Sequence, residues 1–275
     1  MILKNVPVTD DHIHIDLING RGIEAAKDFH RSGGTHIFLV SKPAWSFGII
    51  PKSGEDYRKV FDITLETAEK IRETGVVVYP ILGVHPAELT KLNQFMTLNE
   101  AEKIMCDGLS LAAGYVREKR AVAIKSGRPH YPVEDLVLES SNRILFHALT
   151  LAGEEDCALQ IHAETGPCSD VVDMAKKAGT PVFRVVKHFA SPKTPLTPSM
   201  LAKHESIPDM ASEKRSFTME SDYMDDNQRP GSVIGPKSVP RFTRKMLENN
   251  LISEEDAFRI HKDTPEKVYG VEINL

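Results

Sequence analysis

Short apolar segments alternate with longer amphipathic segments along most of the chain. The apolar segments are nearly continuous and rich in Val, Ile and Leu, which is typical of strands that are buried on both faces. We expect such strands at Val6–Asp16, Thr35–Ser41, Val76–Val84, Ala121–Ser126, Ala158–Ala163 and Phe183–Phe189. The intervening segments have helical periodicity, at Ile23–Arg31, Asp56–Glu73, Asn99–Lys119, Leu136–Ala152 and Ser169–Ala178. Strand-then-helix units in series predict a parallel sheet.

The last third of the chain is less regular. We expect a short seventh strand at Ile207–Ala211 and an eighth at Phe217–Ser221, followed by helices at Val239–Asn250 and Glu254–Ile260. Eight such units close into a (β/α)8 TIM barrel, which takes roughly 250 residues. With 275 residues and no linker, the chain is predicted to be one such domain over residues 1–275.

Composition narrows the range of partners. A net charge of −5 gives no general attraction to nucleic acid or to anionic membranes, although a local basic patch can still bind a strand end. No apolar run approaches the roughly 20 residues of a membrane span, and the N-terminus does not resemble a signal peptide. Cys106, Cys157 and Cys168 are odd in number and widely spaced, so a reducing cytoplasm is expected.

Two histidines close the first predicted strand, in Asp11-His12-Ile13-His14. Residues i and i+2 of a strand face the same way, so His12 and His14 direct two imidazoles toward one point. Neutral imidazole is a favoured ligand of transition metals. Taken alone, such a pair is more often accidental or a cap of a strand than a pair of metal ligands.

Further chemically active residues follow the other predicted strands. These residues are His85, Lys125, His162, His188 and Asp222. In a (β/α)8 barrel the carboxyl ends of the strands meet on one face, where the chemistry takes place. We therefore expect these side chains to converge with His12 and His14.

This order of residues resembles the amidohydrolase superfamily, which has H-x-H after strand one, histidines after strands five and six, and aspartate after strand eight. Within it the chain is most similar to TatD-like metal-dependent hydrolases. Their G-x-H-P, E-x-G-x-x-x-Y and E-T-D motifs resemble Gly83–Pro86, Lys125–Tyr131 and Glu220–Asp222, and their closing helix resembles Asp263–Gly270. The resemblance implies two divalent metals, with Zn expected first and Mn, Co or Mg as the alternatives. One would be held by His12, His14 and Asp222 and the other by His162 and His188.

Lys125 departs from the TatD-like pattern, which has a bridging glutamate at this position. A free ammonium has no acceptor and cannot ligate a cation. Phosphotriesterase-like members of the superfamily instead carry a carbamylated lysine that bridges two metals, and Ala123-Ile124-Lys125 is similar to their sequence. We favour this carbamate, which requires a neutral amine, over an ordinary cation that binds substrate or Asp222.

The implied chemistry is hydrolysis by a metal-activated hydroxide, with Asp222 as general base. The substrate expected first is a phosphoester, nucleic acid ends included. The alternatives are an amide, lactone or cyclic ester, and a non-catalytic barrel that only binds metal or ligand. We expect a soluble cytoplasmic enzyme with no membrane partner, and a homo-oligomer is compatible with the sequence.

Five polar residues near the strand ends are candidates for substrate binding: His85, Arg128, His130, Glu164 and Arg229. His85 could instead stabilise the turn before Pro86, and Arg128 and His130 could belong to a solvated loop. Glu164 shares the face of His162 and could orient it. Arg229 lies in the loop Met224–Gly231, which could also be a salt-bridged structural loop.

Overall fold

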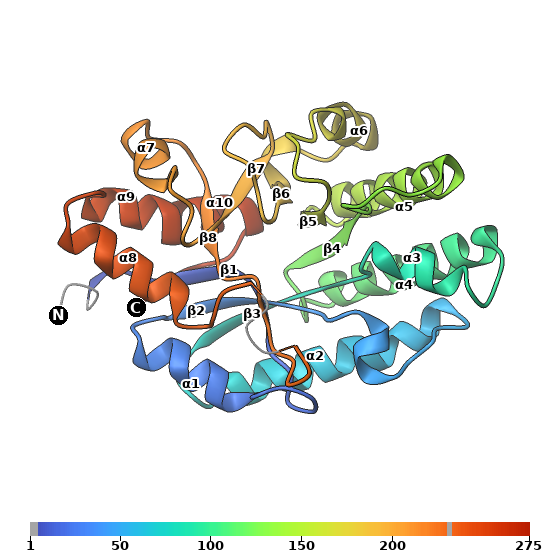
Figure 1. Ribbon diagram of the computed structural model, residues 1–275, viewed down its shortest axis with the longest axis horizontal. Coiled ribbons are helices and arrows are strands. Elements are labelled where there is room, and N and C mark those ends of the chain that lie inside the picture. Colours follow the sequence, from blue (N-terminus) through green and yellow to red (C-terminus); the bar gives the residue numbers. More distant parts are fainter. Residues whose placement is uncertain (1–4, 230–232) are drawn as a thin grey trace.

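In the computed structural model, which describes residues 5–229 and 233–275, parallel strands form one curled sheet (Figure 1). The start of the apolar run Ile2–Val8 and the end of the loop Met224–Gly231 lie outside the described residues. The strand order is β8-β7-β6-β5-β4-β3-β2-β1-β9. The strands are β1 Thr9–His14, β2 His36–Val40, β3 Val77–Gly83, β4 Ala123–Gly127, β5 Ala158–His162, β6 Val185–Lys187, β7 Thr197–Leu201, β8 Thr218–Glu220 and β9 Tyr223–Met224.

One interrupted strand closes the sheet on itself. β8 pairs with β7, and β9 pairs with β1, in register Ile13 to Tyr223. Only Ser221 and Asp222 separate β8 from β9, and the Asp222 N–H donates to the carbonyl of His12 at 2.9 Å. The predicted (β/α)8 barrel is confirmed, with Asp222 at the break in its closing strand.

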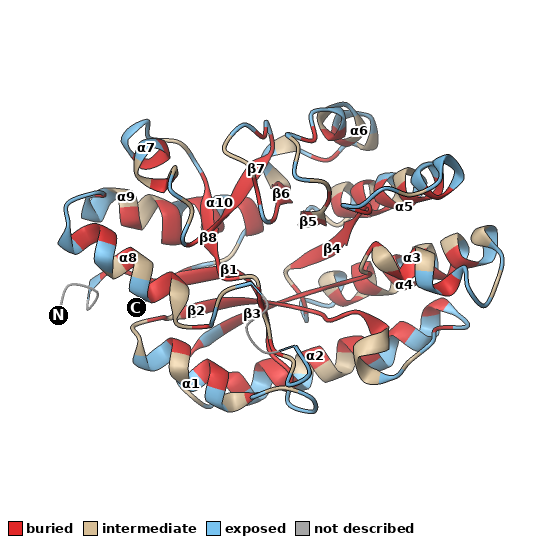
Figure 2. Ribbon diagram, in the orientation of Figure 1, coloured by how far each residue is buried: buried red, intermediate tan, exposed pale blue. Residues whose placement is uncertain are grey.

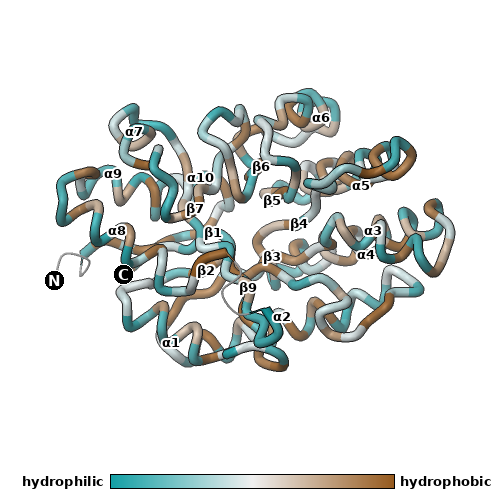
Figure 3. Tube along the Cα trace, in the orientation of Figure 1, coloured by the Kyte–Doolittle hydropathy of each residue, from teal (hydrophilic) through white to brown (hydrophobic). Residues whose placement is uncertain are grey.

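Helices surround the sheet and turn their exposed faces outward (Figure 2). Figure 3 shows the apolar character of the central strands against the polar outer turns of the helices. The α-helices are α1 Ile23–Arg31, α2 Tyr57–Arg72, α3 Ala87–Leu92, α4 Leu98–Arg117, α5 Asp135–Glu154, α6 Asp170–Ala178, α7 Ile207–Ser212, α8 Ser238–Glu248, α9 Glu254–Phe258 and α10 Thr264–Tyr269. None of the described helices is both long and apolar enough to cross a bilayer.

The predicted seventh strand is wrong. Ile207–Ala211 lies in helix α7, and the seventh strand is β7, Thr197–Leu201. Pro208 occupies the first turn of α7, where a missing N–H costs nothing. Proline cannot donate to a ladder and disfavours a strand, yet Pro198 pairs with Lys187 of β6.

A register irregularity shapes the end of β1 beside the site. The pairing of β1 with β2 shifts between Asp10 and Ile13. Such a bulge lets consecutive side chains reach the same side of a sheet. Asp11 and His12 accordingly both contact the Gln160 side chain of β5, while Ile13 packs outward into the core under α1.

Candidate metal centre

Four imidazoles meet at the carboxyl end of the barrel. Nε2 of His12 lies 3.1 Å from Nε2 of His14, and Nδ1 of His162 lies 2.7 Å from Nε2 of His188. The rings of His12 and His188 stack with centroids 4.1 Å apart, which brings the two pairs together. Two nitrogen ligands of one zinc ion are about 3 Å apart, because each Zn–N bond is about 2 Å long. The separation within each pair is close to this value.

Gln160 fixes the tautomer of His12. The amide nitrogen of Gln160 donates to the Asp11 carbonyl at 2.6 Å, since a carbonyl can only accept. The amide oxygen therefore faces His12 and accepts from its Nδ1 at 2.8 Å. With the proton of the neutral ring on Nδ1, the lone pair of Nε2 is directed to the centre of the site.

The contacts of the other three rings differ. His14 Nδ1 donates to the Val40 carbonyl at 2.9 Å, which leaves its Nε2 as the free acceptor. Nδ1 of His188 lies 3.6 Å from a carboxylate oxygen of the buried Glu220. Nε2 of His162 lies 2.6 Å from Nδ1 of His130. His12 and His14 are thus oriented by hydrogen bonds at Nδ1, whereas the buried Nδ1 of His188 has no hydrogen-bond partner among the described residues.

The electrostatics keep these rings neutral at pH 7. Burial lowers the pKa of His12 and His188 well below the ordinary value, and the positive charge of Lys125 lowers it further. The same two causes lower the pKa of His14 to about 3. Neutral imidazoles with convergent lone pairs fit a divalent transition metal.

Asp222 completes the cluster. One ligand atom each from His12, His188 and Asp222 lie within 4.8 Å of one another, and an Asp222 oxygen is 3.8 Å from His12 Nε2. The break between β8 and β9 gives Asp222 a left-handed backbone with φ of 45°. Burial raises the pKa of Asp222 to about 6, against the opposing charges of Lys125 and Lys187.

Lys125 lies within β4 and is buried, with its Nζ 3.4 Å from Nε2 of His12. Burial lowers the pKa of its amine to about 7, even though the carboxylates of Asp222 and Glu220 raise it. Carbamylation requires a neutral amine, which this shift of the pKa favours. The buried position of Lys125 beside His12 therefore fits a carbamate.

A cavity of about 520 Å³ opens above these residues. Along with the four histidines, Lys125 and Asp222, it is lined by three of the predicted substrate-binding residues: His85, His130 and Arg229. Arg128 and Glu164 are not among the lining residues. The Arg128 guanidinium is instead buried in ion pairs with Glu164 and Asp170.

Several polar residues at the site were missed in the sequence. Gln160 accepts a hydrogen bond from His12, and the buried carboxylate of Glu220 lies 3.6 Å from Nδ1 of His188. Both are polar residues inside an apolar strand, two positions before a histidine or aspartate, which was the available signal. Lys42, just after β2, donates to Asp16 at 2.6 Å and to the Asp225 carbonyl at 3.0 Å. This contact joins the loops after β1, β2 and β9 around the cavity mouth.

Comparison with known proteins agrees with the fold. The model of the TatD related DNase family matches residues 9–270. An uncharacterized protein of Methanocaldococcus jannaschii is 37% identical over 287 aligned residues, which cover 100% of this chain and 99% of the relative. The chain belongs to the TatD family of hydrolases.

Two solved structures have a similar fold at low sequence identity. A TatD homologue from Escherichia coli K12 superposes with a TM-score of 0.63 at 18% identity, covering 98% of this chain and all of that one. A PTE-like lactonase mutant from Deinococcus radiodurans gives a TM-score of 0.61 at 12% identity, covering 96% of this chain and 95% of that one. At these identities, the two similarities show the barrel fold alone.

Proposed function

We propose that this chain is a divalent-metal-dependent hydrolase that cleaves phosphoesters. The observation that carries the proposal is the convergence of four neutral imidazoles and Asp222 on one cavity. His12, His14 and Asp222 would hold one ion, and His162 and His188 the other. Carbamylated Lys125 would join the two.

The chain's own groups then have separate tasks. Two divalent ions, when bound, polarise the bond under attack and lower the pKa of a shared water. Asp222 would accept the proton of that water, since its carboxylate lines the cavity beside His12. Histidine-rich ligand sets favour zinc, with Mn, Co and Mg as the other ions to test.

The cavity walls would bind and orient the substrate. His85 accepts from the Ala87 N–H through Nδ1 at 3.2 Å, so the proton of its neutral ring is on Nε2 and can be donated to an ester oxygen. His130 and Arg229 line the same cavity and can contact a negatively charged substrate group.

The DNase description of the family supports a phosphoester substrate, including the end of a nucleic acid strand. The net charge of −5 favours a strand end or a small phosphoester over a long duplex, which needs many phosphate contacts. Lys125 supports a second candidate, hydrolysis of a lactone, cyclic ester or amide, because lysine replaces the glutamate of TatD-like nucleases. A non-catalytic metal-binding barrel is the third candidate.

A substrate panel tests the proposal. Metal-free protein is reconstituted with Zn²⁺, Mn²⁺, Co²⁺ or Mg²⁺ and assayed on bis-nitrophenyl phosphate, single- and double-stranded DNA, a lactone and an amide. Phosphodiester cleavage that is lost with chelator and with Asp222→Asn supports it. Cleavage of the lactone alone supports the second candidate, and no turnover with any ion supports the non-catalytic barrel.

A further inference from the structure

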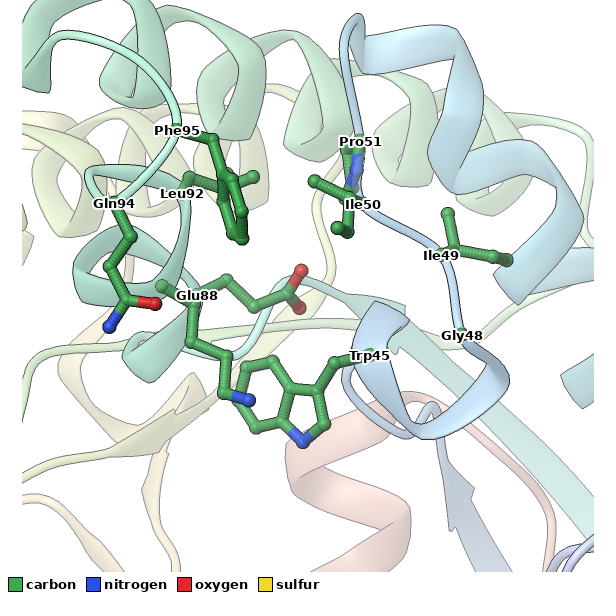
Figure 4. Close-up of a pocket in the computed structure, with 10 residues that line it drawn as sticks. Trp45, Gly48, Ile49, Ile50, Pro51, Glu88, Leu92, Gln94 and Phe95 are labelled. Carbon is green, nitrogen blue, oxygen red and sulfur yellow. The ribbon is translucent and has the colours of Figure 1, made fainter.

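A second cavity lies beside the metal cavity, between the loops that follow β2 and β3. Its volume is about 240 Å³. Its wall consists mainly of apolar side chains, those of Trp45, Ile49, Ile50, Pro51, Leu92 and Phe95. Figure 4 shows Phe95 and Ile50 facing each other across the cavity. The indole of Trp45 lies below both of them in this view.

Trp45 is the wall between the two cavities, because it lines both of them. Its ring meets that of His85 edge to face at a centroid distance of 5.9 Å, and His85 lies 4.7 Å from the ring of His162. A single imidazole therefore separates the indole from the metal centre. The two cavities are therefore adjacent and share the indole of Trp45 as a lining residue.

The buried carboxylate of Glu88 in the second cavity is already engaged. One carboxylate oxygen of the buried Glu88 accepts from the N–H groups of His85 and Ala44, and the other accepts from the Tyr57 hydroxyl at 2.9 Å. Lys91 at the rim places its Nζ 4.8 Å from the centroid of the Trp45 ring. These contacts hold the walls in place and leave an apolar surface for a ligand.

Two of the wall residues are unusually exposed for their size. Phe95 is 63% exposed and Ile50 is 50% exposed, on opposite sides of the cavity. Covering apolar surface of this kind stabilises a bound group, because it removes that surface from water. An engineered apolar cavity of about 150 Å³ binds benzene, so this one has room for a phenyl group with a short alkyl chain.

We propose that this cavity is an apolar subsite of the active site, which binds an aromatic or short alkyl arm of the substrate while the scissile ester lies in the metal cavity. This proposal rests on the proposed function in one respect, the placement of the scissile ester in the metal cavity. Binding of an apolar group can be tested without turnover.

The chain provides its own reporter, because Trp45 is its single tryptophan. Metal-free protein is titrated with phenylpropanol, and with propanol as the probe that lacks the ring, while Trp45 fluorescence is recorded. We expect saturable binding of phenylpropanol, about ten- to a hundredfold tighter than that of propanol. Phe95→Glu and Ile50→Glu, tested separately, should each weaken phenylpropanol binding at least about tenfold. Leu251→Glu is the matched control, since Leu251 is 51% exposed and lies between α8 and α9.

A fluorescence change that does not saturate, or equal affinity in the wild type and both glutamate variants, overturns the subsite.

The metal-loaded enzyme is then compared on phenylpropyl and methyl esters of the same phosphate. A lower KM for the phenylpropyl ester that Phe95→Glu abolishes supports the subsite. Turnover of both esters with equal KM overturns the subsite but leaves the proposed function intact. Phenylpropanol binding without turnover of any ester supports the subsite and counts against the proposed function.

Discussion

Gln160 accepts a hydrogen bond of 2.8 Å from Nδ1 of His12, and its own amide nitrogen is held by the Asp11 carbonyl. The strand-five amide thus sets which nitrogen of the strand-one histidine faces the candidate metals. Because the side chain also donates to the Tyr269 hydroxyl at 2.7 Å, it cannot rotate without losing other hydrogen bonds. The orientation of His12 is built into the barrel before any metal binds.

Replacing Gln160 with methionine should weaken metal binding. Loss of a group that orients a ligand histidine typically costs about 10- to 100-fold in metal affinity. The measurement is a competition with a chelator of known affinity, with circular dichroism to verify the fold. Gln160→Glu keeps an acceptor for His12 and should retain more of the affinity than Gln160→Met. An equal loss in both variants would argue against this orienting role.

Asp222→Asn should lower kcat by about two to four orders of magnitude, because the amide cannot accept the proton of the attacking water. Asparagine tolerates a left-handed backbone, so the φ of 45° at this position should persist. Steady-state kinetics and thermal unfolding measure the two effects. Asp156→Asn is the control, since Asp156 also has a positive φ, of 49°, and its side chain is exposed. An active Asp222→Asn enzyme would remove Asp222 from this role.

Lys125 should carry an added carbon dioxide when metal is bound. Native mass spectrometry of the metal-loaded protein detects the modification, and Lys125→Ala and Lys125→Arg should both lack it. We expect both variants to bind fewer metal ions, because alanine has no amine and arginine cannot supply a neutral one. A free amine in a wild-type protein with full metal occupancy would contradict the bridging carbamate.

Glu88 should make the protein less stable as the pH rises. Burial raises the pKa of Glu88 from 4.5 to about 7 in the folded chain. The unfolded chain therefore releases this proton at lower pH, so the free energy of unfolding falls between about pH 4.5 and pH 7. The loss is roughly 3 kcal/mol, at 1.36 kcal/mol per pKa unit. Glu88→Gln should flatten this part of the pH profile in urea unfolding; an unchanged slope would contradict the assignment.

Arg128→Met should affect stability rather than substrate binding. The Arg128 side chain is 8% exposed and pairs with Glu164 and Asp170, whose side chains are 39% and 57% exposed. Since the partners are partly solvated, we expect a loss of about 1–3 kcal/mol in the free energy of unfolding. KM should stay within about twofold of the wild type. A large rise in KM with unchanged stability would favour the substrate contact that the sequence suggested.

The sequence predicted the barrel and the residues that converge, because both depend on local pattern. Apolar runs define the strands, and residues such as His162 that follow a strand must lie on the same face of the barrel. The assignment of Ile207–Ala211 as a strand failed since its apolar content fits a strand and a helix equally well. Tertiary contacts, which the local pattern does not contain, determine that this segment is helical.

Partners distant in the chain were beyond the reach of sequence pattern. His12 and Gln160 are 148 positions apart, and their hydrogen bond depends on the register of strands that are not neighbours in the sheet. The ion pairs of Arg128 illustrate the same limit, because its neighbours lie in two later segments of the chain. A lone arginine near a strand end does not reveal whether protein or substrate neutralises it.

A zinc titration of the metal-free protein, followed by calorimetry, tests the central claim most directly. We expect two Zn²⁺ ions per wild-type chain. His12→Asn should remove the ion assigned to His12, His14 and Asp222, and His188→Asn the one assigned to His162 and His188, each without unfolding the protein. Absence of saturable zinc binding, or full binding in the double variant with both substitutions, would contradict the two-metal centre.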